Sequence, residues 1–123
     1  MTDVTIAPAD VAVTITLTEN ATGISISVSR EPINLQNELD EVEIEWELAD
    51  AAYAAGWTFA SQGIDIKAPA VVFKNKKGLS LGKKHRWKRH PNHRDGNEYK
   101  YTINVENLDK GTKLTWDPFI LNN

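Results

Sequence analysis

Apolar and polar residues alternate with a period of two along much of the chain, which predicts half-buried β-strands rather than helices. From Val11 to Leu17, aliphatic residues alternate with alanine and threonine, and from Ile24 to Val28 they alternate with serine. The turn-forming sequence Asn20-Ala21-Thr22-Gly23 separates the two runs. These two runs are therefore predicted to form a β-hairpin.

A third run combines an apolar face with a row of carboxylates. Between Val42 and Leu48, four apolar residues alternate with Glu43, Glu45 and Glu47, and Glu41 precedes the run. The four apolar residues share one side only if the segment is a strand. The glutamates are then expected to form a solvated outer face, which typically protects a strand against aggregation.

The rest of the chain predicts further short strands. The alanine-rich stretch from Leu48 to Ala55 is too short for a stable isolated helix and ends at Gly56, so we expect a single helical turn or a connector. Further strands are expected at 57–59, 64–66, 71–73, 99–105, 114–116 and 119–121. Roughly seven to eight short strands separated by turns are typical of a β-sandwich. The fold class expected for residues 1–123 is thus all-β, a single-domain antiparallel Ig-like β-sandwich.

One long segment, Lys74–Asn97, shows no strand pattern and is expected to be a long basic loop. Structureless loops of that length are uncommon in compact domains and are usually functional or disordered. The tryptophans Trp46, Trp57 and Trp116 lie in phase with apolar neighbours and are expected in the core. Trp87 lies inside the basic segment, so we expect it to be exposed.

Composition narrows the possible chemistry. The 123 residues include no cysteine, which excludes disulfides, thiolate nucleophiles, cysteine-ligated zinc and iron–sulfur clusters. Residues 1–10 lack the pattern of a signal peptide, and no stretch approaches the ~18 apolar residues of a membrane span. We therefore expect a cytoplasmic protein without a membrane partner.

Charge is divided unevenly along the chain. Residues 1–66 hold twelve acidic residues and one basic residue, whereas residues 67–123 hold thirteen basic and five acidic residues. This asymmetry is compatible with an anionic partner or with head-to-tail self-association. Strands that fold side by side would instead neutralise it within one molecule.

The basic segment supplies the candidate binding residues. Nine basic residues and three histidines lie between Lys74 and Arg94, with no acidic residue among them. Such a cluster can pair with phosphates while Trp87 stacks on an unpaired base, which predicts a binder of polyanions or single-stranded nucleic acid. The alternative is a solvated loop that offsets the glutamate row. The candidate binding residues are Lys83, Lys84, Arg86, Trp87, Lys88 and Arg89.

Signals for catalysis and metal binding are weak. His90, His93 and Asp95 are closely spaced, and with His85 they suggest a metal-dependent hydrolase as a third hypothesis. The surrounding cations oppose the binding of a metal ion, so no metal site is predicted. No cofactor and no catalytic residue are predicted either. The Gly-x-Ser-x-Gly spacing at 78–82 is not flanked by a convincing strand and helix, as a nucleophile elbow requires. The chain is therefore predicted not to be an enzyme.

Several local sequences together carry a resemblance to a known group of proteins. They are the hairpin, Val42–Leu48, Gly56-Trp57-Thr58-Phe59, Gly63-Ile64-Asp65-Ile66, Tyr99–Val105 and Asp117-Pro118-Phe119-Ile120-Leu121-Asn122. The chain resembles small, functionally uncharacterised bacterial β-sandwich proteins over most of its length. The resemblance implies a fold and no activity.

The function expected from these observations is that of a non-enzymatic interaction module that binds a protein partner or itself. Arg86 and Arg89 would pair with carboxylates, and Trp87 would be an aromatic anchor. Open edge strands and opposite charges on the two halves predict a homodimer. The alternative is a polyanion or single-stranded nucleic-acid binder that uses the basic loop 74–97.

Overall fold

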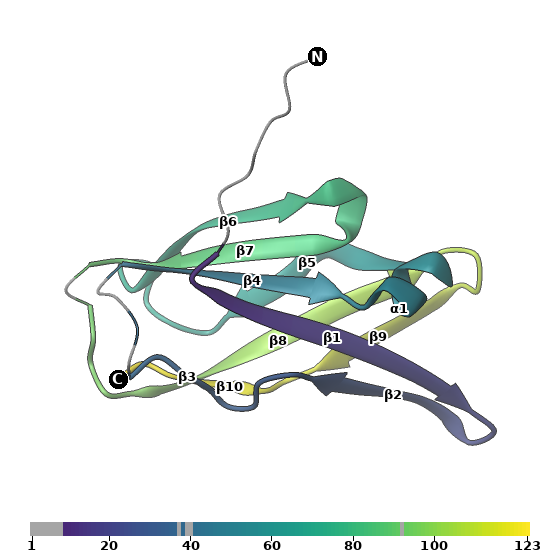
Figure 1. The fold of residues 1–123 in the computed structure, drawn as a ribbon, viewed down its shortest axis with the longest axis horizontal. Coiled ribbons are helices and arrows are strands. Elements are labelled where there is room, and N and C mark those ends of the chain that lie inside the picture. The colour runs from purple at the N-terminus through teal and green to yellow at the C-terminus, as the bar shows by residue number, and fades with distance from the viewer. Residues whose placement is uncertain (1–8, 37, 39–40, 92) are drawn as a thin grey trace, which may run out of the picture.

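Two mixed β-sheets pack together in the computed structural model, which describes residues 9–36, 38, 41–91 and 93–123 (Figure 1). The first sheet has the order β2 (Gly23–Val28), β1 (Val11–Asn20), β4 (Val42–Leu48), β7 (Lys84–Arg89), β6 (Phe73–Leu79). The second has the order β3 (Ile33–Asn34), β10 (Phe119–Leu121), β8 (Glu98–Asn107), β5 (Trp57–Ile66), and β9 (Thr112–Trp116) also pairs with β8. The short helices are α1 (Asp50–Ala54) and η1 (Ser80–Gly82). No helix in these described ranges is long and apolar enough to cross a membrane.

The core lies between the sheets and follows the predicted alternation. Val11, Val13 and Ile15 of β1 lie beside Ile44, Trp46 and Leu48 of β4, and all six are fully or almost fully buried. Tyr101, Ile103 and Val105 of β8 cover them from the second sheet. The Trp46 and Tyr101 rings meet across the sheets with centroids 5.2 Å apart. Trp57 is buried as predicted, and Trp116 is half-buried against the core.

The hairpin and the short helix are confirmed. β1 and β2 pair antiparallel from Ile15–Val28 to Asn20–Gly23, which leaves Ala21 and Thr22 as a two-residue turn. The alanine-rich stretch forms α1, and the chain turns at Gly56 with a φ of 101°, a conformation that favours glycine. Gly56 thus ends the helix and starts β5.

The predicted all-β class with two packed sheets is confirmed, but the prediction of wholly antiparallel sheets with seven to eight strands is wrong. β1 pairs parallel with β4, and β3 pairs parallel with β10. The chain leaves the first sheet after β2, forms β3 in the second sheet, and returns as β4 beside β1. Alternation of apolar residues is the same in parallel and antiparallel strands, so this pattern does not reveal the direction of a neighbour. β3, β6 and β7 bring the strand count above the expected number.

The long basic loop is also a wrong prediction. Much of the segment forms an antiparallel pair, β6 and β7, which η1 connects. β7 lies between β6 and β4 in the first sheet, so it is an internal strand. It pairs there because its basic residues lie opposite the glutamates of β4.

Candidate functional site

Strands β4 and β7 bring the acidic and the basic segments of the chain together in register. The antiparallel pairs include Glu43 with Lys88, Glu45 with Arg86 and Glu47 with Lys84. Because side chains alternate across a strand, all six lie on the outer face of the first sheet. The charge asymmetry of the sequence is therefore neutralised in part within one molecule.

Arg86 is at the centre of this charged face. Its Nε donates a hydrogen bond of 2.8 Å to Glu45 Oε1, and its Nη1 contacts Glu43. Both Arg86, at 5% exposure, and Glu45, at 9%, are buried. Burial alone would lower the pKa of Arg86, but hydrogen bonds and charge from Glu45 and Glu43 raise it above its usual value. Arg86 is thus engaged in a buried ion pair.

The lysines around Arg86 also have acidic neighbours. Lys83 Nζ lies 2.6 Å from Asp50 Oδ1 and 3.3 Å from Glu47 Oε2, and these contacts raise the pKa of Lys83. Lys84 Nζ lies 3.8 Å from Glu45 Oε2 and 3.9 Å from Glu47 Oε1. Lys88 Nζ lies 3.3 Å from Glu41 Oε1.

Two of the candidate binding residues lie on the opposite, inner face of β7. Trp87 is half-buried, and its Nε1 donates a hydrogen bond of 2.8 Å to the Ile64 carbonyl of β5. The prediction that Trp87 is exposed is therefore wrong, because the indole packs between the sheets. Arg89 is fully buried, and its Nη1 donates hydrogen bonds to Asn122 Oδ1 at 2.9 Å and to the Asn123 carbonyl at 3.3 Å.

The six candidate binding residues consequently do not form one basic surface. Four of them have carboxylate neighbours on the outer face: Lys83, Lys84, Arg86 and Lys88. The other two, Trp87 and Arg89, point into the sandwich, where Trp87 is hydrogen-bonded to Ile64 of the second sheet and Arg89 to Asn122. Lys74, Lys76 and Lys77 of β6 are instead exposed cations nearby, and Lys74 and Lys77 lie opposite Lys88 and Arg86 of β7. Among the described residues, neither Lys74 nor Lys77 has an acidic side chain in contact.

The histidines are divided between the core and a loop. His85 is 4% exposed, and its ring packs edge-on against Phe59 with centroids 5.7 Å apart. Burial lowers the pKa of His85 to about 4, and the charge of Lys76 adds to this effect. The His90 and His93 rings lie 5.9 Å apart beyond the end of β7. Over the described ranges, no three histidine, aspartate or glutamate residues are arranged to hold a metal ion.

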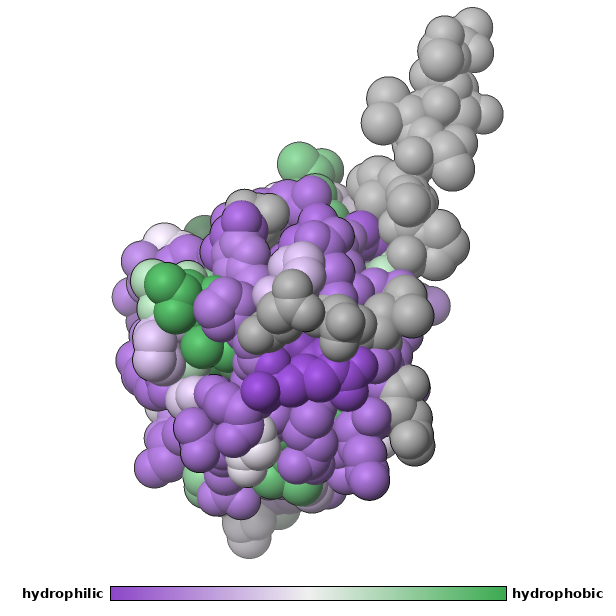
Figure 2. Space-filling view, turned by 90° about the vertical axis from the view of Figure 1, so that its left-hand side faces the viewer, coloured by the Kyte–Doolittle hydropathy of each residue, from purple (hydrophilic) through white to green (hydrophobic). Residues whose placement is uncertain are grey.

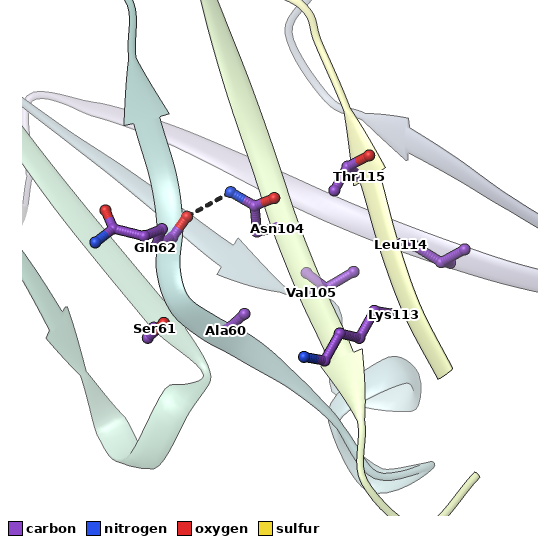
Figure 3. Close-up of a pocket in the computed structure, with 8 residues that line it drawn as sticks. All are labelled: Ala60, Ser61, Gln62, Asn104, Val105, Lys113, Leu114 and Thr115. Atoms are coloured by element: carbon purple, nitrogen blue, oxygen red, sulfur yellow. Dashed lines mark hydrogen bonds between the residues drawn. The ribbon is translucent and has the colours of Figure 1, made fainter. Parts of the chain in front are cut away.

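A shallow depression lies on the outer face of the second sheet (Figure 3). The irregular part of β5, together with β8 and β9, encloses about 240 Å³ there. The Asn104 side chain spans part of it and donates a 2.6 Å hydrogen bond to the Gln62 carbonyl. Among the described residues that line the depression, Lys113 is the one ionisable group. The depression is smaller than ordinary ligand pockets and lacks the paired titratable groups of an active site.

Large exposed apolar residues are scattered. Val71, Leu81 and Leu108 are well exposed, but they lie on three separate connections between strands. The end of the molecule seen in Figure 2 is mostly hydrophilic, with apolar residues in small separate areas. Broad apolar patches typically mark protein interfaces, and this end shows none among the described residues.

Strand β2 differs from the other sheet edges. Its sequence, Gly-Ile-Ser-Ile-Ser-Val, has no charged residue, and among the described residues it pairs only with β1. At the opposite edge of the same sheet, β6 carries Lys74, Lys76 and Lys77. The edge strands of the second sheet also have features that discourage pairing with another chain. β5 has a bulge and Asp65, β9 has Lys113, and β3 is only two residues long. Sequence reasoning identified the β2 strand, but the order of strands in a sheet is not visible in the alternation.

Comparison with known proteins gives no further guidance: no protein-family model matches the chain, and no curated protein is significantly similar to it. The resemblance to small bacterial β-sandwich proteins therefore stays a prediction.

Proposed function

We propose that the protein is a non-enzymatic interaction module that binds a protein partner by adding a strand of that partner to the β2 edge. The observation that carries the proposal is an open, uncharged strand at the end of the first sheet. Extended segments bind such edges through main-chain hydrogen bonds. The proposal assumes the Ig-like arrangement of the two sheets and places the module in the cytoplasm.

The register shows which backbone N–H and C=O groups of β2 point away from β1. The Ser29 N–H donates a hydrogen bond of 3.0 Å to the Thr14 carbonyl, so Ser29 faces β1. Antiparallel pairs alternate between hydrogen-bonded and non-hydrogen-bonded positions, so Ser25 and Ser27 also face β1. The N–H and C=O groups of Ile24, Ile26 and Val28 therefore point to the free edge, where an incoming strand can pair with them.

Natural proteins usually block such an edge. Lysines, bulges and very short strands discourage pairing with another chain, and the other edges of both sheets carry at least one of these features. β2 has none of them. The β-branched residues of β2, two isoleucines and a valine, also favour the extended conformation.

A labelled peptide tests the proposal. The probe carries the sequence of residues 23–28 between flanking lysines, and its fluorescence anisotropy is measured as the protein is added. We expect saturable binding that Ile26→Pro abolishes, because proline removes an outward N–H without removing a hydrogen bond to β1.

Ile26→Ala is the matched control, since it shortens the side chain and keeps the N–H. Circular dichroism would establish that both variants keep their fold. If the peptide does not bind, or if it binds equally to Ile26→Pro, strand addition at β2 is refuted.

The polyanion hypothesis has one supporting observation, which is the exposure of Lys74 and Lys77 without an acidic contact among the described residues. Anisotropy of labelled single-stranded DNA and RNA at low and near-physiological salt would test it. Binding that falls with salt and disappears in Lys74→Ala/Lys77→Ala would support this function. Absence of binding at low salt would refute it, because electrostatic attraction is strongest there.

A further inference from the structure

We propose that the strand received by β2 is the β2 strand of a second copy, in a symmetric antiparallel pair centred on Ile26. This inference rests on the proposed function and names its partner. The β2–β2 pair would join the first sheets of two molecules into one continuous sheet. Figure 1 shows β2 along the outer margin of the molecule, where a second strand could be added.

The outward backbone groups fix the register of this pair. A symmetric antiparallel pair must place one residue opposite its own copy, and the main-chain hydrogen bonds must connect residues 24, 26 and 28. Centring on Ile26 satisfies both conditions and pairs all three outward-facing residues of each copy. Ile24 then lies opposite Val28 of the second copy, and Ser25 lies opposite Ser27 of the second copy.

The side chains are complementary in this register. Ile24, Ile26 and Val28 are half-buried, and they pack against the core on the inner face of the sheet. Pairing with the second copy would cover part of their remaining exposed surface with the same three residues. On the outer face, the exposed Ser25 and Ser27 meet each other. Each contact is therefore apolar with apolar or hydroxyl with hydroxyl.

Charge favours this edge over the other edge of the same sheet. A symmetric β6 pair would bring the lysines of one copy close to lysines of the other (Lys74, Lys76 and Lys77 in each), and like charges on facing strands are destabilising. A β2 pair centred on Ile26 brings residues 24–28 of the two copies together, and none of these residues is charged. The other expected cause of association, attraction between oppositely charged halves, is weakened because β4 and β7 already pair within the molecule.

Cysteine cross-linking tests the register directly, because the chain has no cysteine of its own. In the proposed pair, the Cα atoms of Ser25 and its opposite Ser27 are about 4.5 Å apart, which suits a disulfide. The same residue in the two copies is about 7–8 Å away, which is too far. We expect a mixture of the Ser25→Cys and Ser27→Cys proteins to form mainly mixed covalent dimers on oxidation.

Charged substitutions at Ser25 and Ser27 provide a second test, in which light scattering measures the mass of the protein in solution. Ser25→Lys/Ser27→Lys should be monomeric, because lysines then face lysines. Ser25→Lys/Ser27→Glu should be dimeric, because each lysine then faces a glutamate. Both variants change the same exposed side chains, so a difference between them reports the contact between copies rather than the fold.

A monomeric mass for the unaltered protein at high concentration would overturn this inference. Equal cross-linking of each cysteine variant with itself would overturn the register. If the unaltered protein is monomeric while the labelled peptide still binds, strand addition stands and the second copy is not the partner. If the peptide also fails to bind, both proposals fall.

Discussion

Replacing Arg86 by methionine should destabilise the fold, because the change leaves a buried carboxylate without its main partner. Glu45 is 9% exposed, accepts a hydrogen bond of 2.8 Å from Arg86 Nε, and has Arg86 Nη2 2.8 Å from its Oε1 as an ion pair. Breaking one side of a buried ion pair typically costs about 3–5 kcal/mol. Two features reduce this cost: Lys84 Nζ stays 3.8 Å from Glu45 Oε2 and still offsets its charge, and the half-buried Glu43 can be rehydrated. We therefore expect the free energy of unfolding to fall by about 3 kcal/mol, the lower value.

Urea denaturation followed by tryptophan fluorescence would measure this loss. For a domain with an m-value of about 2 kcal/mol/M, the midpoint should fall by about 1.5 M. Arg86→Met/Glu45→Met should recover most of the stability, because a hydrophobic pair can replace a buried ion pair. Lys84→Ala, a control that removes a more exposed pair, should cost less than about 1 kcal/mol. A loss below about 1 kcal/mol in Arg86→Met, or no recovery in the double variant, would refute this account of β4 and β7.

Three further substitutions test other parts of the fold. His85 has a pKa of about 4 in the folded chain and about 6.5 when unfolded, so its neutral form stabilises the fold fully above pH 6.5. As the pH falls from 6.5 toward 4, the free energy of unfolding should fall by up to about 1.4 kcal/mol per pH unit. Urea midpoints at pH 7 and pH 5 should show this fall, and the His85→Leu variant should lack the contribution of His85. Gly63→Ala places a Cβ 2.8 Å from the Phe59 Cβ and 3.0 Å from His85 Cδ2, and thermal unfolding should show a loss of about 1–3 kcal/mol; unchanged stability would contradict this tight packing. Asn122→Ala leaves Arg89 without a 2.9 Å acceptor and should cost about 2 kcal/mol by urea unfolding, so an unaltered midpoint would exclude a structural role for this contact.

Much of the fold could be predicted because its strands alternate regularly. Val11–Leu17, Ile24–Val28 and Val42–Leu48 each combine one apolar face with one polar face, and all three are strands. The turn at 20–23 and the glycine after α1 are determined by local conformational preferences. These features depend on residues close in sequence, so they are visible without the structure.

Strand β7, one of the strands that the sequence did not predict, alternates between two sets of mostly polar residues rather than between apolar and polar residues. Its inner positions are His85, Trp87 and Arg89, and its outer positions are Lys84, Arg86 and Lys88. Two of the three inner residues are polar, which hides the period of two. Matching the basic alternation of residues 84–88 to the glutamate alternation of residues 43–47 would have predicted the pair.

The candidate site could be predicted least well, because it depends on strand order. The basic residues suggested a binding surface, but their partners on β4 are about 40 positions earlier in the sequence. The open edge depends on which strand ends a sheet. The alternation of Ile24, Ser25 and Ile26 would be the same in an internal strand.

Amide hydrogen exchange along β2 tests the central claim, an open edge that receives a strand, most directly. At low protein concentration, the amides of Ile24, Ile26 and Val28 should exchange fast, whereas those of Ser25 and Ser27 should be protected by β1. As concentration rises or the strand peptide is added, the three fast amides should become protected and the two slow amides should change little. Fast exchange of the three amides under every condition would contradict the claim.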